Sequence, residues 1–339
     1  MLMKTSNIMV WLGLCLLSAL NSNAQPAAVH RLRELVSQGP LSHGRAPDTT
    51  YVNTLTLLAR AYYGVNADSS FYFAKKALQY ADSTGYEKGK AESWRMIGNT
   101  YEMIGNYEEM LSAYHQSRLI AERIGSAAQV AKINMNIGLF YKQMGEFDEA
   151  MELIGKDSVV YDANGDSARL AYTYSHLSDM SLHRQQYDKA LAYIDKAIGV
   201  AVAFKDSLAV SSFTNDKGRI LAADGQYKAA LALHEQCMDH YLRMDDKLGE
   251  AETFILLART HLLLKDYSKA IHYATQGLEL ARQLHRKKEI RDNGQVLADI
   301  YRAKGDDRMA LRYFQLYKDY SDSLLKEQIK KQIFAIEAR

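Results

Sequence analysis

One pattern recurs in this chain every 40 residues, from about residue 91 to residue 330, and it limits the folds that the chain can adopt. Its clearest copy reads W-x2-I-G-x2-Y, from Trp94 to Tyr101. Gly98 aligns with small residues in the later copies, namely Gly138, Ser178, Gly218, Ala258 and Ala298. Met110 aligns with Ala150, Ala190, Ala230, Ala270 and Ala310. Six copies in one register, without insertions, predict a stack of identical units instead of a single closed core.

The spacing within each copy predicts the structure of the unit. Apolar residues at positions 94, 97, 98 and 101 lie on one stripe of an α-helix. A turn near Gly105 ends that helix, and a second stripe passes through positions 107, 110, 111 and 114. Each copy is therefore predicted to be a helix, a tight turn and an antiparallel helix. The two helices should approach most closely where small residues recur, at the positions equivalent to 98 and 110.

The pattern resembles the tetratricopeptide repeat, whose W-x2-L-G-x2-Y signature is nearly intact in the copy that begins at residue 91. The resemblance covers about 280 of the 339 residues, because a degenerate copy (Leu58-Ala59-x2-Tyr62, then Ser70, Ala74 and Ala77) precedes the others. It implies an all-α fold, an α-α superhelical solenoid of about seven helix pairs. The expected repeats are 51–90, 91–130, 131–170, 171–210, 211–250, 251–290 and 291–330.

Two features depart from the family pattern. The repeats lack the usual proline near their end and are six residues longer than the usual 34, which fits longer helices. Lys217 stands where a leucine is expected, and we expect its ammonium group to reach the surface beside Phe213 and Ile220. No proline follows Pro47, which favours an uninterrupted helical array.

Residues 1–24 have the features of a secretory signal peptide. A short positively charged start ending at Lys4 precedes an apolar run from Ile8 to Leu20, and small residues stand before position 25. The 13-residue run spans about 20 Å as a helix, less than the roughly 30 Å of a bilayer core, so cleavage is favoured over retention as an anchor. A lipid anchor at Cys15 is disfavoured by Leu14. We therefore expect export across the inner membrane to the periplasm, a mature chain without a membrane span, and a helix and turn in residues 25–50 that cap the first repeat.

Composition and motifs argue against several function classes. The net charge falls from +2 to +1 when Lys4 is removed, and no basic cluster on one face would attract nucleic acid. Cys237 is then the single cysteine, so no internal disulfide can form. G-x-S-x-G and H-E-x-x-H motifs are absent, and the G-x3-G-K stretch at Gly85 has the wrong spacing for a phosphate-binding loop. We expect no enzymatic activity and no cofactor.

Two groups of histidines have a spacing that could suit a ligand. His234, Cys237 and His240 resemble a soft-metal cluster, but the two histidines are six residues apart on a helix, and a packing role is favoured over zinc. His176 and His183 share a helix without a third ligand, so a surface or groove position is favoured. No metal site is expected.

The resemblance also implies a binding surface, because the first helices of tetratricopeptide repeats line a concave groove. Asparagine at such positions suits an extended peptide, since its amide can both donate to and accept from a peptide backbone. The candidate groove residues are Arg95, Asn99, Lys132, Asn136, Lys142, Tyr172, His176, Asn215, Arg219 and Arg259. Arg95, Asn99 and Asn136 match the subgroup that clamps chaperone carboxyl termini, but Tyr172 and His176 replace its lysine and arginine, which disfavours that specificity.

The C-terminal segment predicts a helix that continues to residue 339. Its apolar stripe consists of Tyr317, Leu324, Leu325, Ile329, Ile333 and Ile336, and no helix-stop signal follows. Residues 331–339 are expected to form the end of this helix, and the exposed stripe to support a homodimer. The segment resembles the one that joins extracytoplasmic repeat arrays of bacterial sensor histidine kinases to a coiled coil.

Two functions remain after these exclusions. The first is a non-catalytic periplasmic module that binds a peptide or protein partner in its concave groove. The alternative is the sensory (input) part of a two-component-type signal transducer that lacks its membrane and kinase domains.

Overall fold

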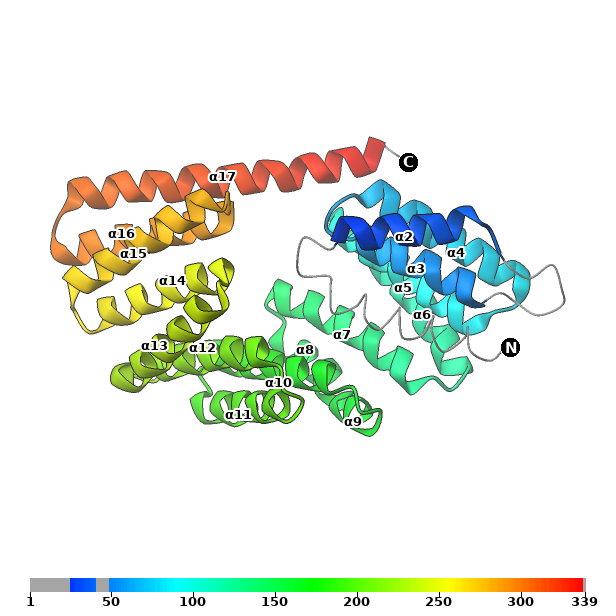
Figure 1. Ribbon diagram of the computed structural model, residues 1–339, viewed down its shortest axis with the longest axis horizontal. Helices are drawn as coiled ribbons and strands as arrows, with labels where there is room; N and C mark the ends of the chain where they lie inside the picture. The colour runs from blue at the N-terminus through cyan, green and yellow to red at the C-terminus, as the bar shows by residue number, and fades with distance from the viewer. Residues whose placement is uncertain (1–24, 41–48, 338–339) are drawn as a thin grey trace. The chain divides into compact units, whose positions relative to one another are not determined.

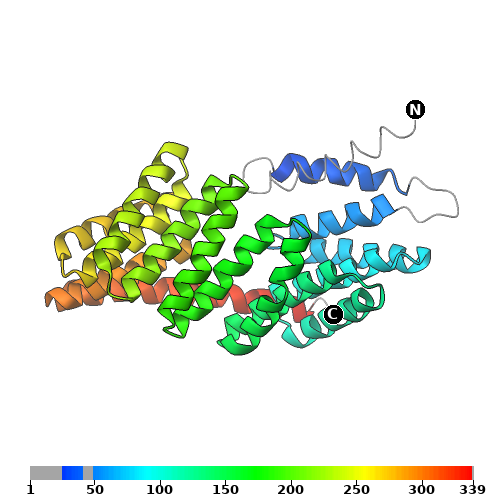
Figure 2. The same ribbon diagram turned by 90° about the horizontal axis from the view of Figure 1, so that it is seen from below.

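The computed structural model describes residues 25–40 and 49–337, and these ranges contain helices and no strand. The expected signal peptide (1–24) and part of the expected N-terminal cap (41–48) lie outside the described residues. Antiparallel helix pairs follow one another along the rest of the chain (Figures 1 and 2). The prediction of an all-α stack of helix pairs is confirmed.

One short helix, α2 (Gln25–Ser37), precedes the pairs. The first helices of the pairs are α3 (Thr49–Tyr62), α5 (Glu87–Met103), α7 (Ala127–Met144), α10 (Ser167–His183), α12 (Ser207–Ala223), α14 (Lys247–Leu263) and α16 (Lys287–Lys304). The second helices are α4 (Ala67–Thr84), α6 (Tyr107–Arg123), α8 (Phe147–Lys156) with α9 (Ser158–Ala163), α11 (Tyr187–Ala203), α13 (Tyr227–Met244), α15 (Tyr267–Gln283) and α17 (Asp307–Glu337). The helices form two compact units, one running to Ile137 and the other comprising Gly138–Ile333, so that the boundary falls within α7.

The recurring small residues lie where helices approach most closely. In the second unit, Ala150, Ala190, Ala230 and Ala270 are fully buried. Ala190 and Ile194 of α11 belong to one core cluster with Ala171 of α10 and Phe213 of α12. Each second helix therefore packs on its own first helix and on the next one, which is why a repeat needs its neighbours to bury its apolar stripe.

Two local features differ from a uniform repeat. The second helix of repeat 131–170 is interrupted at Asp157, between α8 and α9. The Ser158 hydroxyl donates to the Gly155 carbonyl oxygen (2.9 Å), a local hydrogen bond of the kind that competes with helix continuation. The Lys217 ammonium does reach the surface, and there it pairs with Asp195 of α11 at 2.8 Å.

The turns repeat at half the spacing of the sequence pattern. A residue with positive φ occurs every 20 residues from Gly85 to Gly305, once in each turn that joins two antiparallel helices. Most of these residues are glycines, which adopt this conformation without steric cost. Five are not, namely Gln185, Lys205, Asp245, Lys265 and His285. These positions store backbone strain, because a Cβ disfavours the left-handed region.

Replacing Lys265 (φ 60°) by glycine is therefore expected to raise the free energy of unfolding by about 0.5–1 kcal/mol, because relief of strain exceeds the entropic cost of glycine. Gly105→Ala (φ 75°) is the opposite test and should lower it by about 1 kcal/mol. Urea denaturation would measure both changes. A Lys265→Gly variant that is less stable than the parent would contradict the strain argument.

Candidate functional site

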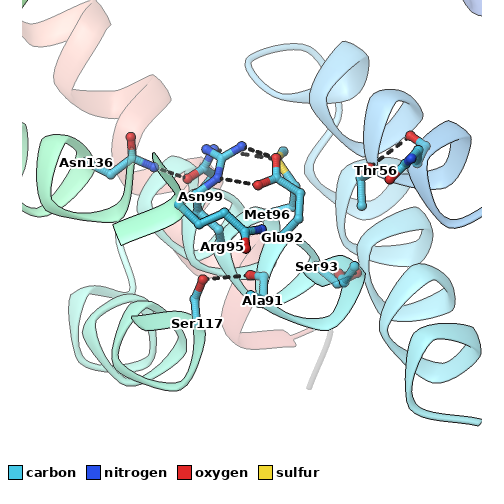
Figure 3. A network of polar contacts seen from close by, with 12 residues as sticks. Thr56, Ala91, Glu92, Ser93, Arg95, Met96, Asn99, Ser117 and Asn136 are labelled. Carbon is cyan, nitrogen blue, oxygen red and sulfur yellow. Dashed lines mark hydrogen bonds and ion pairs between the residues drawn. The ribbon is translucent and has the colours of Figure 1, made fainter. Parts of the chain in front are cut away.

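Four of the candidate groove residues lie in the first unit, on α5 and α7. Two of them bond to each other: Asn136 Nδ2 donates to Asn99 Oδ1 at 2.7 Å (Figure 3). The hydroxyl of Tyr114, from α6, donates to the same oxygen at 2.9 Å. The two asparagines are thus held as one pair, although they are separated by 37 residues in sequence.

In each side-chain amide of this pair, one polar atom takes part in the Asn99–Asn136 hydrogen bond and the other does not. Asn99 Nδ2 has only a long contact to the sulfur of Met96 (3.8 Å). The carbonyl oxygen of Asn136 points away from Asn99 (Figure 3). The expectation that each asparagine offers both a donor and an acceptor is therefore wrong for this pair. The pair as a whole offers one amide donor and one amide acceptor.

Tyr114 is positioned by the small residue opposite it. A Cβ on Gly98 would lie 2.5 Å from Tyr114 Cδ1, so only glycine at position 98 lets the ring pass across α5. The ring is fully buried, while its hydroxyl reaches Asn99 and also contacts Glu102 Oε2 at 3.3 Å. Burial and the Glu102 charge raise the pKa of Tyr114, so its hydroxyl stays a donor at neutral pH.

The carboxylate of Glu92 lies close to the positive charges of Arg95 and Lys132. Arg95 binds Glu92 through two hydrogen bonds, of 2.5 and 3.1 Å (Figure 3). Burial tends to raise the pKa of Glu92, but the charges of Arg95, Lys132 and Arg60 outweigh it and lower the pKa to about 2. Glu92 is therefore ionised at neutral pH and offsets part of the positive charge of Arg95 and Lys132.

A second polar cluster lies in the second unit, on α7, α10 and α12. Asp179 accepts from Lys142 at 2.6 Å and from Arg219 at 2.7 Å. Arg219 also contacts Asp216 at 3.2 Å. Two cations and two carboxylates thus bridge three successive first helices.

The environment sets the protonation of this cluster. Burial raises the pKa of Asp179, but Arg219 and Lys142 together lower it to about 2. For Asp216, burial is the larger effect and the pKa is raised. Burial and the Lys142 charge lower the pKa of His176 to about 4, against the opposing effect of Asp179. His176 is therefore neutral at pH 7 and can act as a hydrogen-bond partner, not as a cation.

Comparison with protein families gives three matches, each described as tetratricopeptide repeat, at residues 131–156, 208–283 and 295–322. These matches fall on the helix pairs described above. The chain contains tetratricopeptide repeats. No curated protein matches its sequence.

Solved structures of similar fold include several tetratricopeptide-like solenoids. Apo RapI has a TM-score of 0.66 at 14% identity, covering 83% of this chain and 99% of its own. A Rap protein complexed with Competence and Sporulation Factor has a TM-score of 0.62 at 13% identity, covering 88% and 86%. The Rap conjugation gene regulator of plasmid pLS20, in complex with the Phr* peptide, has a TM-score of 0.60 at 17% identity, covering 81% and 74%. At these identities the similarity establishes the fold.

The other candidate residues of this protein differ in exposure. Tyr172 is half exposed (51%) and its ring packs edge-on against Phe213, with centroids 5.4 Å apart. Arg259 is exposed, and the described residues form no ion pair with it. The prediction for Asn215 is wrong, because this residue is buried. It donates to Thr253 at 2.7 Å and lies 3.1 Å from His234 Nδ1.

The burial of Asn215 has a local cause. A Cβ on Gly218 would lie 2.5 Å from His234, so the glycine admits the His234 ring, which then meets Asn215. His234 and Cys237 are both buried, in agreement with a packing role. Within residues 25–40 and 49–337 no group of three or more histidine, cysteine, aspartate or glutamate residues could hold a metal ion. None of the described helices is long and apolar enough to cross a membrane.

Proposed function

We propose that this protein is a non-catalytic module that binds a peptide or protein partner along its first helices. The tetratricopeptide fold supports a protein-interaction role in general, and two of the solved proteins of similar fold carry a bound peptide or factor. The observation that carries the proposal is the Asn99–Asn136 pair, which presents an amide donor and an amide acceptor on adjacent first helices. An extended peptide offers the complementary pair in each residue, one carbonyl oxygen and one N–H.

The pair is organised before a ligand arrives. Tyr114 fixes the Asn99 oxygen and Asn136 is fixed by the same oxygen, so that a peptide would not have to order either amide. Preorganisation of this kind reduces the entropic cost of binding. The neighbouring Arg95–Glu92 pair contributes little net charge, which favours recognition of backbone amides over recognition of a free carboxylate.

Asn136→Ala is the sharpest test of the groove. Peptides selected against the parent from a random library should bind this variant about 5- to 150-fold more weakly, which corresponds to about 1–3 kcal/mol. Calorimetric titration would measure the change. Gln116→Ala is the matched control, because it removes an exposed amide from α6 and should leave the affinity unchanged. Equal affinity of Asn136→Ala and the parent would place the binding site elsewhere.

Asn99→Ala would change stability as well as binding. Its oxygen accepts the hydroxyl of the buried Tyr114, so its removal should also lower stability by about 1 kcal/mol. Tyr114→Phe removes only that hydroxyl and keeps the ring. If the tyrosine positions the pair, this variant should weaken peptide binding without a matching loss of folded structure by circular dichroism.

We place this function in the periplasm, supported by the signal-peptide features of residues 1–24. We keep the sensory part of a signal transducer as the second candidate, because α17 presents an apolar stripe. Leu325, Ile329 and Ile333 are 55%, 43% and 51% exposed and recur every four residues on this helix. A second copy of α17 could bury them, and a dimer would transmit binding from one chain to the other.

Ile329→Asp combined with Ile333→Asp should therefore convert a dimer into a monomer, because two charges would have to be buried in the seam. Light scattering would measure the mass of both proteins. Replacement of Lys326 and Lys330, exposed on the same helix, by alanine is the control and should leave the dimer intact. A parent that stays monomeric at high micromolar concentration would rule out this interface.

A further inference from the structure

One repeat of the second unit contains a pocket that the groove does not use. The pocket has a volume of about 390 Å³ and lies between α12 and α13, in repeat 211–250. Its wall includes Lys205 in the preceding turn, Thr214 on α12, and Gln236, His240 and Arg243 on α13. This volume falls in the range of about 300–1,000 Å³ that is typical of small-molecule sites.

This repeat lacks a pair of aromatic rings that both neighbouring repeats have. In the preceding repeat, Tyr174 stacks with Tyr193 at a centroid distance of 6.4 Å. In the following repeat, Phe254 lies against Tyr273 at 6.3 Å. The equivalent positions here, 40 residues away, are Thr214 and Leu233. Thr214 lines the pocket, at a position where the neighbouring repeats carry a tyrosine or a phenylalanine.

Two polar residues of the pocket wall differ from the equivalent residues in the neighbouring repeats. Lys196 lies over the Tyr174 ring, 5.5 Å from its centroid, whereas its equivalent Gln236 lines the pocket. His240 takes a position that is aliphatic in the neighbouring copies, where Val200 and Leu280 stand. Its Nε2 is buried without a hydrogen-bond partner among the described residues. This ring nitrogen is therefore available to form a hydrogen bond with a bound group.

Charge at the mouth of the pocket is mainly positive. Lys205 and Arg243 are both exposed. Arg243 Nε donates to the Asp239 carbonyl oxygen (3.1 Å), but its terminal nitrogens have no bond to the described residues. Asp206 is the single carboxylate in the wall, and its Oδ1 already accepts the Ala209 N–H at the start of α12 (2.9 Å). The mouth of the pocket thus has two cationic side chains, and the one carboxylate of the wall is already bonded to the backbone.

The thiol in the wall is held in its protonated form. Cys237 is buried and its sulfur donates to the Ser211 carbonyl oxygen at 3.2 Å. Burial raises the pKa of this thiol to about 12, with a smaller contribution from Asp216. A thiolate does not form at neutral pH, so the pocket is suited to reversible binding and not to covalent chemistry.

We propose that this pocket binds a small organic anion, a carboxylate or a phosphate ester. Lys205 and Arg243 would hold the anionic group, and Thr214, Gln236 and His240 would contact the remainder of the molecule. The proposal is independent of peptide binding, because it rests on α12 and α13 and not on the Asn99–Asn136 pair. Each site can therefore fail its test without affecting the other.

The test is a thermal-shift series with succinate, citrate, glucose 6-phosphate and inorganic phosphate, each compared with chloride at equal ionic strength. At ten times its Kd, a binding anion should raise the melting temperature of the parent by about 2–3 °C. A response to succinate or citrate would identify a carboxylate site, and a response to glucose 6-phosphate alone a phosphate-ester site. No response to any organic anion, or an equal response to inorganic phosphate, would overturn the proposal.

Two variants link the shift to the pocket. Thr214→Tyr restores the ring found in the neighbouring repeat, so it should fold normally and abolish the shift by filling the space. Lys205→Gly with Arg243→Gln removes both charges, and the glycine also relieves a backbone strained at φ 64°. Lys228→Ala removes an exposed lysine of α13 outside the pocket and should keep the full shift. A shift that persists in Thr214→Tyr would show that the anion binds elsewhere.

Discussion

Gly98→Ala is expected to lower the free energy of unfolding by about 1–3 kcal/mol, although alanine is the better helix former. The added Cβ would lie 2.5 Å from the Tyr114 ring, and that ring is fully buried and cannot move aside. The equivalent glycine of the second unit is equally close to its neighbour, because a Cβ on Gly138 would lie 2.5 Å from Ile154. Urea denaturation, monitored by helical circular dichroism, would measure the loss.

Gly199→Ala is the matched control, because it makes the same change inside a helix where nothing lies within 4 Å of the new Cβ. Only the higher helix propensity of alanine should then affect Gly199→Ala, and its free energy of unfolding should rise by about 0.5–1 kcal/mol. Adding Tyr114→Leu to Gly98→Ala should remove most of the penalty, since the clashing ring is gone. If Gly98→Ala and Gly199→Ala change stability in the same direction, close approach of the helices is not the reason for the glycine at position 98.

The sequence was sufficient to predict the parts of the fold that depend on periodicity. Small residues at one spacing and apolar residues at steps of three and four determine which faces of the helices meet, so the helix pairs and the buried alanines such as Ala190 could be predicted. The interruption at Asp157, between α8 and α9, could not, because the neighbouring copies have one continuous helix there. The strained turn at Lys205 was also missed, because the repeat usually places glycine there and tertiary packing imposes the same conformation on lysine.

The sequence could predict which residues lie on the candidate binding surface, but not the hydrogen bonds among them. Position on a first helix was enough to select Asn99 and Asn136, but not to show that they bond to each other. Tyr114 was missed because it belongs to the buried stripe of a second helix, and only its hydroxyl contacts Asn99. Asn215 was included wrongly, since a polar residue near a helix face can be buried when a neighbouring glycine admits a histidine beside it.

Acidic pH should destabilise both units through carboxylates whose pKa the fold lowers. Glu92 has a pKa of about 2 in the folded protein against an ordinary value of 4.5, and Asp179 about 2 against 3.8. As pH falls, the unfolded state therefore takes up protons first. The stabilisation of the folded protein by these two ionised carboxylates is complete above about pH 4.5, and it is lost as pH falls from there to about 2.

Replacing Glu92 by glutamine or Asp179 by asparagine should thus cost about 2–3 kcal/mol each at pH 7 and almost nothing near pH 2. Both side chains are mostly shielded from solvent, at 26% and 18% exposure, so water screens these pairs only in part. Urea denaturation at a series of pH values would measure the difference from the parent. Glu279→Gln, an exposed change on α15, should show no such pH-dependent cost.

Asp216→Asn separates the effect of charge from the effect of contact. Asp216 binds the same Arg219 as Asp179 does, at 3.2 Å, yet burial raises its pKa instead of lowering it. A raised pKa means that the ionised form is less favourable in the folded protein than in the unfolded chain, so above the ordinary value of 3.8 the charge of Asp216 opposes folding. Asp216→Asn should therefore leave stability at pH 7 unchanged or raise it, while Asp179→Asn lowers it. Equal losses in the two variants would mean that Arg219 needs both carboxylates, and that burial is not what distinguishes them.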